Sequence, residues 1–283
     1  ARPLGISSHM AALGIAEMVD ETMANAARVH AVERGYDARD HVLIAFGGAA
    51  PLHVGRIAEK LHISQIIIPT NAGVGSAIGF LRAPVAYEVV RSRNMLLRDF
   101  DSEIINSLMS EMQVEALSVV KAGASNSRIK EDRVAFMRYA GQGHEIIVPL
   151  PSRRLSPNDS VILQRAFDEE YEKLYGRVLP NADVEILTWA LTAMTEEVKP
   201  QLLAVISMTI DATPHGKRLI FDPASGKEIN VPLYWRPDLI PGSKIKGPAL
   251  IAEDETSSFI PQTFDASIAL NNYIILNRKI EIG

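Results

Sequence analysis

Two adjacent glycines stand where an apolar segment changes into a helical pattern, and this junction is the part of the chain best suited to chemistry. The apolar run 42–46 is typical of a buried strand, and Gly47 and Gly48 follow it, ahead of a helical pattern over 51–62. Glycines let the backbone turn tightly and let a flat ligand lie against the main chain, while a helix start offers free N–H groups. The segment 47–50 therefore predicts either a nucleotide-contacting loop or a plain turn.

The residues next to the glycines fit the first of these interpretations. Ala49 and Ala50 keep the side chains small where a ring would lie on the backbone, and Pro51 suits the first helical position. His53 stands at the start of the helix, where its imidazole could reach a substrate or a ribose, or could only cap or pack. Phe46 is interpreted as a buried side chain of the strand.

The patterns around this loop predict an α/β region with a parallel sheet. A long helix is expected over 8–34, capped by Ser7 or Ser8, and strands are expected over 42–46 and 65–68. Alternation over 85–92 favours one more strand. The long helix has an apolar stripe that we expect to face the core, formed by Ile15, Met18, Val19, Thr22, Ala26 and Val29.

A second glycine-containing loop, 71–76, follows the strand at 65–68. Ligands of α/β sheets collect at the carboxyl ends of the strands, so Asn71 and Ser76 could face a cleft. A turn followed by a helix cap explains the same residues without a ligand.

The second half of the chain reads as rich in strands. Helices are expected over 101–121, capped by Asp101 or Ser102, and over 160–175. Two segments joined by Pro223-Ala224-Ser225-Gly226 predict a hairpin. The strands expected in this half are 134–136, 146–148, 184–194, 217–221, 229–235, 249–252, 258–260, 267–270 and 273–276.

A series of motifs occurs in one order along the whole chain. It consists of Met23-Ala24-Asn25-Ala26-Ala27-Arg28-Val29, Glu33-Arg34-Gly35-Tyr36-Asp37, Ala45-Phe46-Gly47-Gly48-Ala49-Ala50-Pro51-Leu52-His53, Ile67-Ile68-Pro69, Gly73-Val74-Gly75-Ser76-Ala77-Ile78-Gly79, Arg138-Tyr139-Ala140-Gly141-Gln142 and Lys246-Gly247-Pro248-Ala249-Leu250-Ile251. This series resembles the hydantoinase A / 5-oxoprolinase / acetone carboxylase beta-subunit family. The resemblance implies an α/β fold: the C-terminal part of an actin-like (sugar-kinase-type) ATPase domain over 1–98, followed by a β-rich α+β domain over 99–283.

The resemblance also implies a cofactor and partners. The cofactor would be ATP with Mg²⁺, and the adenosine side would be contacted by Gly47, Gly48, Ala49, Ala50 and His53. Phosphate-binding glycine hairpins of the Asp-x-Gly-Gly-Thr kind do not occur in the 283 residues. We therefore expect a partner chain or N-terminal segment that carries these hairpins and most of the Mg²⁺ ligands, together with a hydantoinase B-type subunit.

By the same resemblance, the expected activity is ATP-dependent hydrolysis of a cyclic amide, through phosphoryl activation of the carbonyl oxygen. Two alternatives remain: a subunit of an acetone- or acetophenone-type ketone carboxylase, and a non-catalytic structural subunit of such a complex. A Rossmann-type dinucleotide domain is rejected because 47–50 lacks the Gly-x-Gly-x-x-Gly spacing. The catalytic residues and the particular substrate are not indicated by the residues themselves.

Composition narrows the remaining classes. The net charge of −5 without a long basic run argues against nucleic acid or an anionic membrane as a partner. The chain has no cysteine, which excludes disulfides and thiolate ligands and fits a cytoplasmic location. No two of the seven histidines are four residues apart, so a metal site made by this chain alone is not expected.

Two polar segments have less direct interpretations. The segment 138–145 holds Arg138, Gln142, His144 and Glu145, but strand alternation does not bring these groups to one face, and a hairpin with solvated charges explains them. The acidic stretch 253–255 could bind a cation, and a solvated turn is the simpler interpretation.

Overall fold

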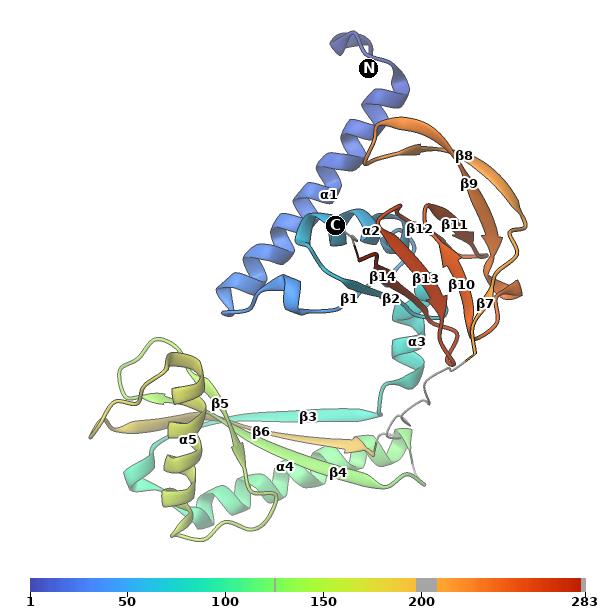
Figure 1. Cartoon of the computed structure of the whole chain (residues 1–283). Helices are drawn as coiled ribbons and strands as arrows, with labels where there is room; N and C mark the ends of the chain where they lie inside the picture. Colours follow the sequence, from blue (N-terminus) through green and yellow to red (C-terminus); the bar gives the residue numbers. More distant parts are fainter. Residues whose placement is uncertain (125, 197–207, 281–283) are drawn as a thin grey trace. The chain divides into compact units, whose positions relative to one another are not determined.

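The computed structural model describes residues 1–124, 126–196 and 208–280. It divides into two compact units, which Figure 1 shows with the sequence coloured from blue to red. One unit takes in Ala1–Arg82 and the described residues of Gln201–Gly283, and the other takes in the described residues of Ala83–Pro200. The mixed α/β fold agrees with the predicted fold class. Within the described ranges, no helix is both long enough and apolar enough to cross a membrane.

The first unit is built on a mixed sheet of six strands. Its order is β1-β2-β14-β13-β10-β7. The strands are β1 (Leu43–Ile44), β2 (Gln65–Ile68), β7 (Ile210–Asp211), β10 (Ser243–Lys246), β13 (Phe264–Ile268) and β14 (Ile274–Arg278). β1 and β2 are parallel, as their sequence predicts, whereas β2 is antiparallel to β14 on its other side. The parallel pair is thus the edge of a sheet that the end of the chain completes.

A second sheet of four strands belongs to the same unit, in the order β12-β11-β9-β8. Its strands are β8 (Gly216–Asp222), β9 (Lys227–Trp235), β11 (Ala249–Ala252) and β12 (Ser257–Ile260). The predicted hairpin is present as β8 and β9, and the Asp222 carboxylate accepts the backbone N–H of Ser225 in its turn. An Asp that binds backbone donors in this way stabilises a tight turn.

Three helices belong to the first unit: α1 (Ser8–Glu33), α2 (Ala50–Leu61) and α3 (Gly75–Arg82). Ser7 caps α1 by accepting the N–H of Met10, as predicted. α2 buries Val54, Ala58 and Leu61 in a core that it shares with the six-stranded sheet. α1 packs along α2 (Figure 1). Short 3-10 turns lie at Arg2–Leu4, Ala38–Asp40, Ala72–Val74 and Arg236–Asp238.

The expectation that the apolar stripe of α1 faces the core is wrong for this chain. Ile15 is 65% exposed and Met18 is 72% exposed, while the buried residues of α1 are Asp20 and Ala24. The reason lies in α2, whose facing side carries cations, so the acidic and small side of α1 is the one that meets it. Periodicity marks a face for burial but does not identify the surface that buries it.

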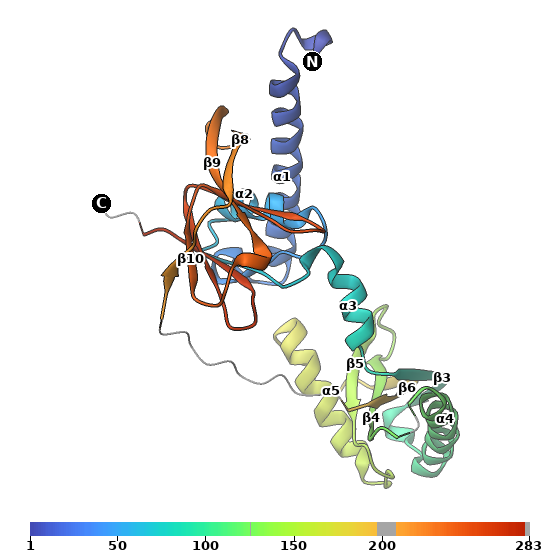
Figure 2. The same ribbon diagram turned by 90° about the vertical axis from the view of Figure 1, so that its right-hand side faces the viewer.

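The second unit is an antiparallel sheet with two helices. The strand order is β3-β6-β4-β5. The elements are β3 (Ala86–Leu96), the 3-10 turn η4 (Leu97–Asp99), α4 (Ser102–Gly123), β4 (Ile129–Tyr139), β5 (Ile146–Leu150), α5 (Asp159–Tyr175) and β6 (Val184–Thr195). Both helices contribute to one core with one face of the sheet, in which Trp189 and Phe167 are fully buried. Figure 2 shows α5 beside β5, and Figure 1 shows α4 along the strands.

The two units do not coincide with the domain division 1–98 and 99–283 expected from the sequence. β3 begins at Ala86 and pairs with β6, and the last strands return to the first unit because β14 pairs with β2. The division at 98 follows from the resemblance to the family, whereas contacts define a compact unit, so the two divisions need not agree. The division at 98 stays a prediction for the domains of the family.

Candidate functional site

Three loops of the first unit meet at the end of the parallel strand pair. The glycine loop 46–49 lies between β1 and α2, the segment 71–75 follows β2 and ends at the first residue of α3, and the loop 253–256 joins β11 to β12. The Gly47 N–H donates to the Ala72 carbonyl at 2.7 Å, and the Thr256 hydroxyl donates to the Gly48 carbonyl at 2.5 Å. These bonds fix the course of the glycine loop from both sides, so it is an anchored turn.

Close packing supports the same three-loop cluster. A Cβ at Gly73 would lie 2.8 Å from the Cβ of Glu255, and one at Gly75 would lie 2.6 Å from the ring of Phe46. Phe46 itself is 57% exposed, so the prediction that it is buried strand core is wrong. β1 contains only two residues and ends before Phe46, whose ring lies against Gly75 instead.

The two glycines of the loop serve different purposes. Gly47 has a φ of +108°, a conformation that side-chain-bearing residues rarely adopt, so it makes the turn. Gly48 has no positive φ, is exposed, and a Cβ built on it would meet nothing within 4 Å. Gly47 is thus required by the backbone, whereas the space next to Gly48 is open to a ligand.

The first turn of α2 begins directly after these glycines. Ala49 is the N-cap and has no side chain to bind the helix N–H groups, and Pro51 lies in the first turn as the sequence predicts. Ala49 is exposed and Ala50 is half-buried. The glycine loop, Ala49 and Ala50 therefore present main chain and methyl groups, the surface that a planar ring needs.

His53, in the first turn of α2, is paired with Asp20 of α1. Its Nδ1 lies 2.7 Å from Oδ1 of Asp20, whose side chain is 4% exposed, while the imidazole is 29% exposed. Burial raises the pKa of the Asp20 carboxyl, and the hydrogen bond from His53 opposes that effect. A buried carboxylate on α1 therefore holds the ring of His53.

Ion pairs flank the Asp20–His53 pair along the same two helices. The Glu17 carboxylate accepts from Arg56 at 2.8 Å and from Lys60 at 2.6 Å, and Lys60 also reaches Glu21 at 2.7 Å. The hydrogen bond from Arg56 is the main reason that the pKa of Glu17 falls to about 2. Residues 17, 20 and 21 of α1 share one face, which accounts for this polar contact between helices.

A cavity of about 260 Å³ lies beside the loops at 71–75 and 253–256. Its wall includes Arg236, which is buried and bonded to Glu253 at 2.8 Å. The same guanidinium donates to the carbonyls of Pro69 and Asn272, at the ends of β2 and β14. Arg236 therefore ties together the ends of β2 and β14. Asn71 and Glu255 also line the cavity. Ser76 is not among the residues that line it.

The described part of the chain contains no group of three His, Asp or Glu side chains placed to hold a metal ion. The acidic stretch 253–255 makes structural bonds instead, since Glu253 pairs with Arg236 and Glu255 packs on Gly73.

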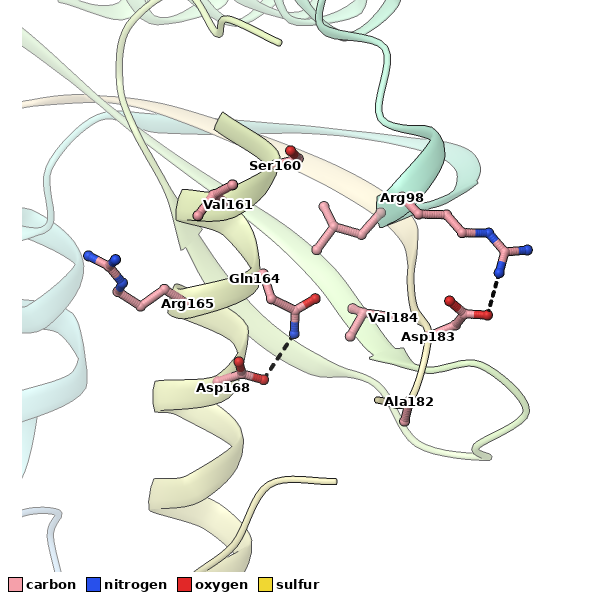
Figure 3. Close-up of a pocket in the computed structure, with 10 residues that line it drawn as sticks. Arg98, Ser160, Val161, Gln164, Arg165, Asp168, Ala182, Asp183 and Val184 are labelled. Carbon is pink, nitrogen blue, oxygen red and sulfur yellow. Dashed lines mark hydrogen bonds and ion pairs between the residues drawn. The ribbon is translucent and has the colours of Figure 1, made fainter. Parts of the chain in front are cut away.

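A groove on the second unit has different chemistry. It has a volume of about 490 Å³ and lies between α5 and the start of β6. Arg98 donates to Asp183 at 2.6 Å, and Gln164 donates to Asp168 at 3.0 Å. Figure 3 shows both pairs, with Arg165 extending away from Gln164. Four polar side chains of the groove bind in these two pairs, so they are less free to bind a ligand.

The polar segment 138–145 does not form a site of its own, as strand alternation predicted. Arg138 pairs with Glu185 at 2.7 Å, while Tyr139 is buried and its hydroxyl accepts the N–H of Leu179. Gln142 donates to the hydroxyl of Tyr171 at 2.8 Å. These groups stabilise the second unit from several directions and do not converge.

Sequence reasoning missed three residues of the first unit. Asp20 pairs with His53, Thr256 donates to Gly48, and Arg236 donates to Pro69 at the end of β2. An acidic residue on the buried face of a helix is the one local signal, and it identifies Asp20 only if the buried face is known. The other two act across more than 160 positions of sequence.

Comparison with known proteins places this geometry in a family. A model of the hydantoinase/oxoprolinase family matches residues 1–89, and a model of the hydantoinase/oxoprolinase C-terminal domain matches residues 98–279. The caprolactamase subunit alpha of Pseudomonas jessenii is 30% identical over 274 residues, which cover 95% of this chain and 39% of that subunit. The 5-oxoprolinase PfmaA of Pestalotiopsis fici is 27% identical over 98% of this chain and 21% of its own length.

Solved structures share the fold. The crystal structure of the ATP-dependent caprolactamase of Pseudomonas jessenii has a TM-score of 0.74 and 29% identity over 99% of this chain and 41% of its own. A nucleotide-free structure of acetone carboxylase has a TM-score of 0.78 at 24% identity, over the same shares. The chain thus spans about two fifths of these proteins. On the match of both models along nearly its whole length, the chain belongs to the hydantoinase/oxoprolinase family.

Proposed function

We propose that this chain forms the adenosine-side wall of an ATP-dependent enzyme that hydrolyses a cyclic amide. The observation that carries the proposal is the anchored glycine loop, with open space at Gly48 and the uncapped start of α2 directly behind it. Relatives of the family include an ATP-dependent caprolactamase and a 5-oxoprolinase. The nucleotide contacts would come from Gly47, Gly48, Ala49, Ala50 and His53.

The residues present fit a nucleoside. A ring needs a flat surface without projecting side chains, and exposed Gly48 and Ala49 offer one, held in place by the bonds to Ala72 and Thr256. The free N–H groups at a helix start suit oxygen atoms of a ligand. ATP would supply the phosphoryl group that activates the carbonyl oxygen of the substrate.

The phosphates and Mg²⁺ would be held mainly outside this chain. The described residues offer no metal cluster, and phosphate hairpins do not occur in the 283 residues. Several relatives are named as subunits, among them caprolactamase subunit alpha. We accordingly propose a partner chain or N-terminal segment with the hairpins, and a second, hydantoinase B-type subunit.

A lactam is favoured over a ketone as the substrate by sequence similarity. Identity reaches 30% with the caprolactamase subunit, against 24% with an acetone carboxylase beta subunit of Xanthobacter autotrophicus and 26% with an acetophenone carboxylase gamma subunit of Aromatoleum aromaticum. The ketone carboxylase remains the second candidate because acetone carboxylase has the same fold. Turnover of caprolactam or oxoproline by the assembly, compared with carboxylation of acetone, separates the two.

Gly48→Val tests the nucleotide contact. The added side chain has room in this chain, so the fold should persist, and it should occupy the space of the base. We expect the assembly to bind ATP at least about tenfold more weakly, which is about 1.4 kcal/mol. Gly216→Val is the matched control, since its Cβ also meets nothing within 4 Å in the same unit. The measurement is ATP titration by calorimetry.

The result also decides between an enzyme and a structural subunit. Unchanged ATP affinity for Gly48→Val, in an assembly shown to be folded, would remove the nucleotide role of this loop and favour a structural subunit. A loss of affinity as large for Gly216→Val would show that the assay reports disturbed folding.

The isolated chain should hydrolyse no ATP, with or without a lactam or a ketone. The reason is that the phosphate hairpins and metal ligands lie in other segments on this proposal. The check is phosphate release from pure chain with ATP and Mg²⁺. Sustained turnover by the chain alone would contradict the proposal.

A further inference from the structure

We propose that Asp20 is a positioning residue for His53: it keeps the imidazole in the Nδ1–H form, so that Nε2 accepts a hydrogen bond from an O–H or N–H group of a ligand at the glycine loop. This inference rests on the proposed function, because it concerns the same site. It adds a residue from another helix and specifies the chemistry that the histidine offers.

The hydrogen bond between the two side chains selects the form of the ring. Oδ1 of Asp20 lies 2.7 Å from Nδ1 of His53. An ionised carboxylate can only accept, so a neutral imidazole must donate through Nδ1, which leaves Nε2 with a lone pair. Burial makes this carboxylate more basic than an exposed one, as the raised pKa of Asp20 indicates, and strengthens the acceptor.

The surroundings hold the carboxylate in place. Asp20 is buried next to Ala24, which is fully buried where α1 packs on α2. The bonds from Glu17 to Arg56 and Lys60 join the two helices one turn away. A carboxylate on a rigid helix, enclosed by a second helix, cannot follow the imidazole to a new orientation, so the ring orientation is fixed.

The other nitrogen is the one available to a ligand. Nδ1 faces a side chain that is only 4% exposed, so the exposed part of the ring lies away from it, and Nε2 has no hydrogen-bond partner among the described residues. The ring stands on the first turn of α2, directly after the glycine loop. An acceptor there suits a ribose hydroxyl or a lactam N–H, and does not suit a phosphate oxygen.

A purely structural role explains the pair less well. A buried carboxylate that only filled space between two helices would be replaced by an apolar side chain at no loss, because burying a charge is unfavourable. The burial of Asp20 is explained if its carboxylate serves to orient His53 and to leave Nε2 free for a ligand. The two roles differ in a measurable property, the position of the imidazole hydrogen.

The first experiment measures that position in the full chain. ¹⁵N-labelled histidine spectra are recorded over a range of pH and compared at the alkaline plateau, where the signals no longer change, and His53 is assigned by loss of its signals in His53→Gln. We expect the Nδ1–H form in the native chain and a marked loss of it in Asp20→Asn, since an amide can donate as well as accept. Glu21→Gln, a carboxylate one residue away that binds Lys60, is the control and should leave the spectrum unchanged. A native His53 in the Nε2–H form would overturn the proposal.

The second experiment identifies the donor in the assembled enzyme. We expect Asp20→Asn to weaken one ligand by about five- to tenfold, the range for one hydrogen bond in a site. If the donor is a ribose hydroxyl, 2′-deoxy-ATP or 3′-deoxy-ATP should bind native and variant enzyme equally. If the donor is the lactam N–H, native enzyme and Asp20→Asn should have equal KM values for the N-methyl lactam, which lacks this hydrogen.

The outcomes separate this inference from the proposed function. Equal binding of ATP and lactam by native enzyme and Asp20→Asn, with the histidine form changed, would overturn the acceptor role. Gly48→Val would still weaken ATP in that case if the proposed function holds. Failure of both variants to affect ATP or lactam would remove the two proposals together.

Discussion

The helices α1 and α4 have similar apolar patterns, yet these patterns lie in opposite environments. In α4, Ile105, Met109 and Met112 are buried against the sheet of the second unit. In α1, Ile15 and Met18 are mostly exposed, and the helix meets its neighbour through carboxylates and small residues. An apolar stripe thus indicates a helix face suited to burial. The chain itself buries this face in α4 and leaves it exposed in α1.

The difference bears on the partner. Exposed large apolar side chains along one helix are a common sign of a surface that another protein segment covers. Along α1 these include Ile15, Met18, Val19, Val29 and Val32. This exposure supports the proposal of a partner chain or N-terminal segment, whereas the buried stripe of α4 needs none.

The largest expected effect is the loss of a core side chain in α4. Met112→Ala should destabilise the second unit by about 2–5 kcal/mol, because it leaves a cavity in a packed core. Met18→Ala in α1 should change the stability of the chain by less than about 0.5 kcal/mol. Urea unfolding followed by tryptophan fluorescence measures both effects, since Trp189 lies in the core next to α4 and Trp235 lies in β9 of the unit that contains α1.

The effects of Met18→Ala and Met112→Ala on association with the partner should have the opposite order to their effects on stability. Met18→Ala should weaken association with the partner, measured by native mass spectrometry, while Met112→Ala should act only through folding. Equal, small effects of both variants on the stability of the chain would mean that the two helices do not differ as described.

The caps of the two helices should differ in the same direction. Asp101 accepts the N–H groups of Glu103 and Ile104 at the start of α4, so Asp101→Ala should cost about 1 kcal/mol. Ser7 caps α1 where the helix is exposed, and fraying there should limit the loss for Ser7→Ala to about 0.5 kcal/mol or less. Urea midpoints at fixed slope test this order, and a larger loss for Ser7→Ala would contradict it.

The response of the α1–α2 contact to acid is a smaller effect than the loss of the α4 core side chain. The pKa of Glu17 is about 2 in the folded chain against an ordinary value of 4.5, so its contribution is complete above pH 4.5 and is lost as the pH falls toward 2. Because Glu17 is about one-third exposed, solvent should limit the contribution to about 1 kcal/mol or less. Native chain and Glu17→Gln are unfolded in urea at pH 7 and near pH 3.

We expect the native chain to be more stable at pH 7 and the two proteins to approach each other near pH 3. A gap that stays constant over this range would show that the Glu17 pairs add nothing. Glu111→Gln, a carboxylate of α4 outside the ion pairs between described residues, is the control for general effects of charge.

Local signals in the sequence predict much of the fold. The bounds of β2, the cap of α4 at Asp101 and the parallel pair of β1 and β2 all agree with expectation. Each depends on residues within a few positions, where alternation, capping side chains and glycines act directly. The sequence does not predict which of the two adjacent glycines makes the turn and which one faces open space. In the structure the positive φ lies at Gly47 and not at Gly48.

Contacts between distant segments were not predictable in this way. Thr256 reaches Gly48, Asp20 reaches His53, and β14 pairs with β2, but none of these residues differs locally from others of its type. The apolar residues of α1 were misplaced for the same reason, since burial depends on which neighbour arrives. The sequence thus predicts where the candidate site lies, and the tertiary contacts supply its partners. The nucleotide role of Gly47, Gly48, Ala49, Ala50 and His53 stays a prediction.

The position of β14 has a consequence for synthesis. Gln65 of β2 and Asn277 of β14 are hydrogen-bonded although they are 212 positions apart, while the second unit is formed by a continuous stretch between them. A ribosome releases the whole second unit before it releases β14, so that unit can fold while β2 still lacks its neighbour. During that interval the edge of β2 is open to wrong pairing, and late closure of so long a loop is slow. Nascent chains that stop short of β14 should therefore depend most on chaperones.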